Sequence, residues 1–118
     1  MPTISLSADD PEATRLALLR LLAERPALSQ RELSQELGLS LGKTHYVLHA
    51  LLDKGLVKAR NFQRSDRKIA YAYLLTPAGL REKLQLTRSF LSRKEREFGL
   101  LQETIAALRA EVDRVTDE

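Results

Sequence analysis

The sequence of 118 residues contains no cysteine. This absence excludes disulfide bonds, thiolate metal sites and thiol-based redox sensing, and it fits a reducing cytoplasm. No apolar run approaches the roughly 18 residues that a membrane span requires. The N-terminus has no basic stretch followed by an apolar one, so we expect no signal peptide and a cytoplasmic protein. The length allows one compact domain with one appended element.

The sequence motifs of common catalytic sites are absent as well. There is no phosphate-binding glycine loop and no Ser-x-Gly nucleophile turn, and the acidic residues are scattered. We therefore expect no enzyme activity and no cofactor. His45, His49 and Asp53 follow one another at intervals of four, a spacing that would offer three metal ligands on one helical face. We expect no metal there, because no cysteine supports the site and the histidines have a simpler role, described below.

Positive charge is concentrated in the middle of the chain. The formal net charge is only +3, but residues 40–79 hold seven Lys or Arg against two Asp or Glu. Residues 80–118 hold eight of each kind. A basic segment joined to a charge-balanced one indicates a polyanion-binding domain next to a second element. A solvated basic face without a partner is the alternative.

Two helix starts are visible in the first third of the chain. Asp10 followed by Pro11 combines a capping carboxylate with proline at the first helical position, and predicts a helix that ends at Arg25. Ser29, with Glu32 three residues later, forms a capping box. A second, short helix should therefore follow Ser29.

A third helix should follow after a tight turn. Gly38 is placed to adopt the left-handed conformation that ends the second helix, and Ser40 is the next N-cap candidate. A helix, a glycine-containing turn and another helix form the helix-turn-helix arrangement. The third helix is predicted from about Leu41 to Lys54, and its inward-facing residues are predicted to be Thr44, Val47, Leu48 and Leu51.

The periodicity then changes from helical to alternating. Residues 56–61 and 69–75 are rich in β-formers, and the polar, basic segment between them predicts a hairpin with a charged tip. The cations on or beside this tip are Arg60, Arg64, Arg67 and Lys68. Arginine suits the narrow minor groove of DNA. This hairpin, called the wing below, is therefore expected to contact a minor groove or phosphates. A merely solubilising loop is the alternative.

The last third carries a heptad pattern of apolar residues. We expect one helix over most of residues 77–115, about 50 Å long, which the short N-terminal domain could not cover. A second copy of the same helix is the simplest partner, and folding back onto its own domain is the alternative. The heptad positions form an apolar stripe along this helix. It also includes Leu80, and it is interrupted by the polar residues Thr87 and Lys94. The predicted dimer interface is Leu84, Leu91, Phe98, Leu101, Ile105, Leu108, Val112 and Val115.

Two segments resemble the MarR-type regulators. They are LSQRELSQELGLSLGKTHYVLHALLDKGLV, at residues 28–57, and YLLTPAG after the wing, at residues 73–79. At a finer level, the stretch from Ser40 to Phe62 and the start of the last helix are similar to a compact subgroup associated with exopolysaccharide biosynthesis loci. The resemblance implies a mainly α fold with one small β-hairpin, the winged helix-turn-helix. Together with the sequence pattern, this predicts a flexible segment at residues 1–9, a DNA-binding domain at 10–76 and a C-terminal dimerisation helix at 77–118.

The expected function is a sequence-specific, double-stranded DNA-binding transcriptional regulator that acts as a homodimer. In this fold the recognition helix enters the major groove, and its exposed face would be Leu41, Gly42, Lys43, His45, Tyr46 and His49. Backbone N–H groups at the helix starts Ser29 and Ser40 would bind phosphate. The operator should be an imperfect inverted repeat. The competing hypothesis is a winged helix that binds another protein and no DNA. The sequence leaves a small-molecule effector open.

Overall fold

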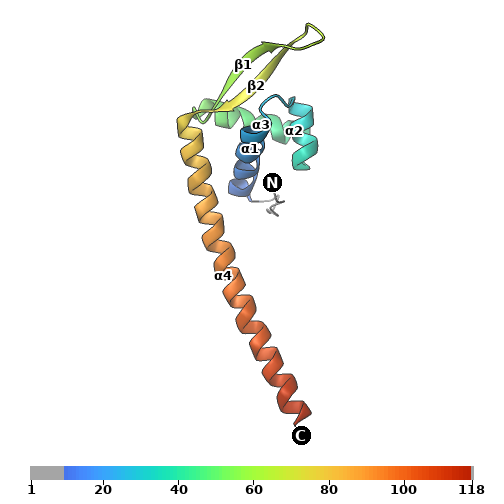
Figure 1. Cartoon of the computed structure of the whole chain (residues 1–118), viewed down its shortest axis with the longest axis vertical. Helices are drawn as coiled ribbons and strands as arrows, with labels where there is room; N and C mark the ends of the chain where they lie inside the picture. The colour runs from blue at the N-terminus through green and yellow to red at the C-terminus, as the bar shows by residue number, and fades with distance from the viewer. Residues whose placement is uncertain (1–9, 118) are drawn as a thin grey trace. The chain divides into compact units, whose positions relative to one another are not determined.

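The structure, a computed structural model, describes residues 10–117 (Figure 1). The segment 1–9, predicted to be flexible, lies outside the described residues. In chain order the elements are α1 (Pro11–Glu24), α2 (Gln30–Leu37), α3 (Leu41–Asp53), β1 (Val57–Gln63), β2 (Ile69–Leu75) and α4 (Pro77–Thr116). The predicted fold class, mainly α with one small hairpin, is therefore confirmed.

Local sequence sets the helix boundaries as predicted. The Asp10 carboxylate accepts a hydrogen bond from the Glu12 N–H at 2.9 Å and caps α1. Both bonds of the capping box at α2 are present: the Glu32 N–H donates to Ser29 Oγ at 3.1 Å, and the Ser29 N–H donates to Glu32 Oε1 at 3.0 Å. Gly38 ends α2 in the left-handed conformation, with φ of 67°.

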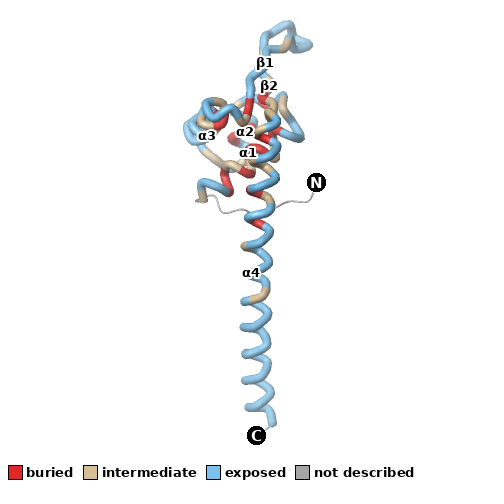
Figure 2. The backbone as a smooth tube through the Cα atoms, turned by 90° about the vertical axis from the view of Figure 1, so that its left-hand side faces the viewer, coloured by how far each residue is buried: buried red, intermediate tan, exposed pale blue. Residues whose placement is uncertain are grey.

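The hydrophobic core is built mainly from leucine residues of the first three helices. The backbone tube of Figure 2 shows buried positions in red. On α3, Thr44, Leu48 and Leu51 are buried as predicted, whereas Val47 is only half-buried. Burying one face of α3 leaves its opposite face available to solvent. The largest fully buried side chains are Leu18, Leu19, Leu22, Leu33, Leu48, Leu51 and Thr44.

The predicted hairpin is present, with both boundaries of its first strand corrected. β1 begins at Val57, one residue later than expected, and continues to Gln63, two residues further. The extension arises because Phe62 pairs with Ala70 and Gln63 with Ile69 in the antiparallel ladder. The polar segment predicted to connect the two strands therefore supplies the last two residues of β1, and the connection is shorter than predicted by those two residues.

The chain divides into two compact units, Met1–Leu86 and Thr87–Glu118, with the division inside α4. The first unit holds the three short helices, the hairpin and the first turns of α4. The second unit is the remainder of α4. Within residues 10–117, no helix combines the length and apolar character needed to cross a membrane.

The connection from the wing into α4 requires a glycine. The Thr76 hydroxyl donates to the Gly55 carbonyl at 2.6 Å and accepts from the Gly79 N–H at 3.1 Å. These bonds bring the first turn of α4 so close to Leu56 that a Cβ atom at Gly79 would overlap the Leu56 carbonyl oxygen. Because that oxygen belongs to the backbone, the overlap cannot be relieved by rotating a side chain.

Gly79→Ala is therefore expected to destabilise the first unit by about 1–3 kcal/mol, the usual cost of overpacking. Gly99→Ala is the matched control, since Gly99 lies in the same helix with open space around its Cα. It should stabilise the helix by up to roughly 1 kcal/mol. Urea unfolding followed by circular dichroism measures both changes. Equal stabilisation by the two substitutions would contradict the close approach at Gly79.

Candidate nucleic-acid interface

The solvent-facing side of α3 is the most distinctive surface of the first unit. Ser40 caps the helix by accepting from the Lys43 N–H at 3.0 Å, and the Thr44 hydroxyl donates to the Ser40 carbonyl at 2.9 Å. With its other face in the core, α3 is held rigidly. Tyr46 is 75% exposed, which is high for a large aromatic side chain. All six residues predicted for this face are exposed: Leu41, Gly42, Lys43, His45, Tyr46 and His49.

The wing presents cations at its tip. The turn is closed by a hydrogen bond from the Arg64 N–H to the Lys68 carbonyl at 2.9 Å, and Arg67 has a φ of 67°. Asp66 lies between them and forms an ion pair with Arg64 at 3.8 Å. Arg64, Arg67 and Lys68 are exposed. Cations on an exposed hairpin tip are suited to contact phosphates or a minor groove.

Arg60 is also exposed, but its position differs from the prediction. It lies within β1 opposite Ala72, not beside the tip, because the strand extends to Gln63. Arg60 therefore lies on the strand itself, three residues before the end of β1, and is not part of the tip.

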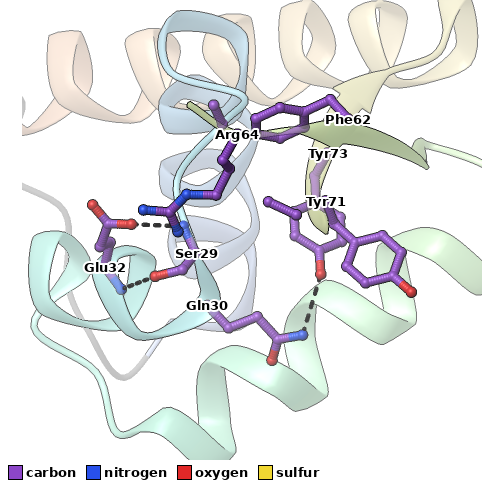
Figure 3. Close-up of a pocket in the computed structure, with 9 residues that line it drawn as sticks. Ser29, Gln30, Glu32, Phe62, Arg64, Tyr71 and Tyr73 are labelled. Atoms are coloured by element: carbon purple, nitrogen blue, oxygen red, sulfur yellow. Dashed lines mark hydrogen bonds between the residues drawn. The ribbon is translucent and has the colours of Figure 1, made fainter. Parts of the chain in front are cut away.

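An open notch of about 450 Å³ lies between the start of α2 and the wing (Figure 3). Arg64 extends from the wing over Ser29 and Glu32 (Figure 3). The hydrogen bonds from Ser29, followed by the positive charges of Arg64 and Arg25, lower the pKa of the Glu32 carboxyl. Glu32 thus stays ionised and keeps the Ser29 N–H, which was predicted to bind phosphate, engaged in the capping box.

A chain of side-chain contacts joins α3 to the wing through α2. Gln30 Oε1 lies 3.0 Å from His45 Nδ1, and Gln30 Nε2 donates to the Tyr73 hydroxyl at 3.3 Å. The second of these bonds is drawn in Figure 3. Gln30 was not among the predicted site residues. Only its position directly after the Ser29 cap, with its side chain free to turn toward the next helix, could have suggested it.

The two histidines of α3 contact each other. The His45 and His49 rings lie 4.1 Å apart, centroid to centroid, with an interplanar angle of 40°. Across residues 10–117, no group of three or more His, Cys, Asp or Glu side chains converges as metal ligands. The His45, His49 and Asp53 spacing therefore does not produce a three-ligand cluster in this part of the chain.

Residues 11–58 match the family model described as winged helix-turn-helix DNA-binding. The match covers the three short helices and the entry into the wing. The fold is that of a winged helix-turn-helix protein. A search of curated proteins found no match.

Solved structures share this fold at low sequence identity. The PcaV transcriptional regulator of Streptomyces coelicolor is 23% identical, with a TM-score of 0.59 over 88% of this chain and 76% of that one. A MarR transcriptional regulator from Methanosarcina mazei is 23% identical, with a TM-score of 0.60 over 74% and 61%. Staphylococcus aureus MarR, solved with salicylate and kanamycin, is 18% identical, with a TM-score of 0.56 over 88% and 73%.

Proposed function

We propose that this protein is a sequence-specific, double-stranded DNA-binding transcriptional regulator that acts as a homodimer. The observation that carries the proposal is the exposed face of α3, where Lys43, His45 and Tyr46 lie near the helix N-terminus. In helix-turn-helix proteins, the N-terminal residues of the motif's second helix, which is α3 in this chain, contact base edges in the major groove. Lys43 would donate to guanine O6 or N7 or to phosphate, and Leu41 would pack on a thymine methyl.

The wing supplies the electrostatic part of the proposed interface. Its exposed cations Arg64, Arg67 and Lys68 would contact phosphates or the adjacent minor groove. Each phosphate that a protein cation neutralises releases counterions from DNA, which makes binding salt-dependent. The wing would therefore contribute affinity for all sequences, while α3 would contribute discrimination among them.

The homodimer is supported by the apolar stripe of α4. From Phe98 to Val115, every predicted interface side chain is exposed, from 41% at Ile105 to 69% at Val115. Long apolar stripes at heptad spacing are typical of helices that pair with another helix. A second copy of α4 supplies the same stripe. A two-fold dimer would present two α3 helices, so its operator should be an imperfect inverted repeat.

We further propose that the chain belongs with the MarR-type regulators, in the compact subgroup associated with exopolysaccharide loci, and that it acts in the bacterial cytoplasm. The segments at residues 28–57 and 73–79 support this assignment, as does the fold shared with MarR proteins. The genes next to its coding sequence test the subgroup. Neighbours without any polysaccharide biosynthesis function would contradict it.

Neutralising the wing should weaken binding to every DNA sequence. A variant with glutamine at Arg64, Arg67 and Lys68 is expected to lose up to about three units of the slope of log K against log salt, about one for each phosphate contact. The matched control carries glutamine at Arg96, Arg109 and Arg114, which removes the same charge from α4. Fluorescence anisotropy on a random duplex between 50 and 200 mM salt measures both slopes. An unchanged slope in the wing variant would show that the wing does not contact DNA.

The competing function is a winged helix that binds only other proteins. Such a module should not bind random duplex DNA at low salt, whereas the proposed regulator should bind it and lose affinity steeply as salt rises. The same anisotropy titration on the wild-type chain therefore separates the two functions. Absence of any binding at 50 mM salt would favour the protein-interaction module.

A further inference from the structure

The surroundings of His45 carry an inference that rests on the proposed function and deepens it. We propose that Gln30 is a positioning residue that fixes the tautomer of His45, so that His45 presents a hydrogen-bond acceptor to the major groove. The base it would contact is then one that carries an exocyclic amino group, adenine or cytosine.

The first step is the anchoring of Gln30. It is the first residue of α2 and is half-buried. Its amide nitrogen donates to the hydroxyl of Tyr73, which is only 7% exposed and whose backbone N–H donates to the Pro26 carbonyl at 3.0 Å. Tyr71 lies beside Tyr73 in a stacked arrangement, with ring centroids 6.4 Å apart. The amide of Gln30 is thus oriented by the hydroxyl of a tyrosine that is itself largely buried and held by a backbone hydrogen bond.

The second step is the tautomer. With its nitrogen turned to Tyr73, the Gln30 amide directs its oxygen to His45 Nδ1 at 3.0 Å. A carbonyl oxygen can only accept, so Nδ1 must carry the proton and donate. In a neutral imidazole the other nitrogen is then an acceptor. The Nε2 atom of His45 therefore has a lone pair to offer from the exposed face of α3.

The third step is the class of base. In the major groove, adenine N6 and cytosine N4 are donors, whereas guanine presents only the acceptors O6 and N7. Phosphate oxygens are acceptors as well. A neutral His45 held in the Nδ1–H form can accept from adenine or cytosine, and it lacks the proton required by guanine or phosphate. Gln30 would thereby determine base preference at a position that it does not itself contact.

The tautomer can be measured on the full chain without DNA. Long-range proton–nitrogen NMR spectra distinguish the two neutral forms of imidazole. They would be recorded at pH 8, which is well above the range in which histidine ordinarily becomes doubly protonated. The chain has only two histidines, so His49→Gln assigns the signals. We expect the Nδ1–H form at His45, its loss in Gln30→Leu, and its retention in Gln30→Glu, which keeps an acceptor. Gln35→Leu, the same substitution at an exposed site of α2, is the control.

The consequence for DNA is tested by selecting duplexes from a random pool at pH 8. The wild type and Gln35→Leu should prefer adenine or cytosine at one position of each half-site. In Gln30→Leu, that preference should fall by roughly three- to tenfold, which is the discrimination that one hydrogen bond supplies. The base preferences at the other positions should be unchanged. If the wild-type spectrum shows the Nε2–H form, the Gln30 amide is reversed, with the Tyr73 hydroxyl donating to it, and the inference is overturned. An unchanged base preference in Gln30→Leu would also overturn it. If neither protein binds duplex DNA, the proposed function fails instead, and the base-contacting role of His45 fails with it.

Discussion

Replacing Leu101 and Leu108 with glutamate should convert the proposed dimer into monomers. Both side chains are exposed in the single chain and lie in the proposed seam between two α4 helices. A dimer would lose the burial of four leucines, at about 1.5–3 kcal/mol each, which weakens association by at least about 6 kcal/mol, or on the order of 10,000-fold. The carboxylates would also face one another in an apolar seam, which adds a desolvation cost.

A control with the same charge change is available on the same helix. Leu100 and Ala107 are also seven residues apart and exposed, but each lies one position before the seam residues. The Leu100→Glu/Ala107→Glu variant should therefore remain dimeric. Light scattering coupled to size-exclusion chromatography gives the mass of both variants. A dimeric Leu101→Glu/Leu108→Glu variant would show that the seam is misplaced. Monomers in both variants would show that added charge on either face of α4 dissociates the dimer, so that the effect is not specific to the seam.

Replacing Lys43 and Tyr46 with alanine should flatten the DNA sequence preference while leaving much of the salt-sensitive binding. Among residues 10–117, neither side chain makes a hydrogen bond or ion pair, so their removal should leave the fold intact. Each side chain that makes a good base contact contributes roughly 1–3 kcal/mol of discrimination. Loss of both proposed contacts should reduce preference at the affected positions by roughly ten- to a hundredfold. The salt-sensitive binding should persist, because the proposed phosphate contacts of the wing are independent of sequence.

Lys54→Ala serves as the control for this experiment. Lys54 is the C-cap residue at the far end of α3 and is exposed, so its loss removes a cation from the same helix away from the proposed reading residues. Selection from a random pool, followed by comparison of the enriched motifs, measures the effect. If the Lys43→Ala/Tyr46→Ala variant stays folded and dimeric and selects the wild-type motif with equal discrimination, α3 is not the recognition helix.

The parts of the fold that depend on local sequence could be predicted. The caps at Asp10, Ser29 and Ser40 and the left-handed Gly38 each involve residues within a few positions of one another. The division of α3 into a buried and an exposed face followed from helical periodicity in the same way. Local signals of this kind are complete within a short window of sequence.

Features that depend on tertiary pairing could not be predicted. The end of β1 was set too early because Phe62 and Gln63 become strand residues only by pairing with Ala70 and Ile69. The contact of Gln30 with His45 spans 15 residues, and its bond to Tyr73 spans 43. The need for glycine at position 79 arises from the Leu56 carbonyl, which only the folded connection brings close. None of these pairings has a signature in the neighbouring sequence.

The most direct test of the account is selection of duplex DNA by the wild-type chain at physiological salt. We expect an enriched, imperfect inverted repeat whose half-site centres lie about 10–10.5 base pairs apart, or a small multiple of that spacing. The enriched duplex should bind roughly a thousandfold or more tighter than a random one. Failure of the folded, dimeric protein to enrich any motif, together with no affinity for random duplex at low salt, would contradict its proposed function as a DNA-binding regulator.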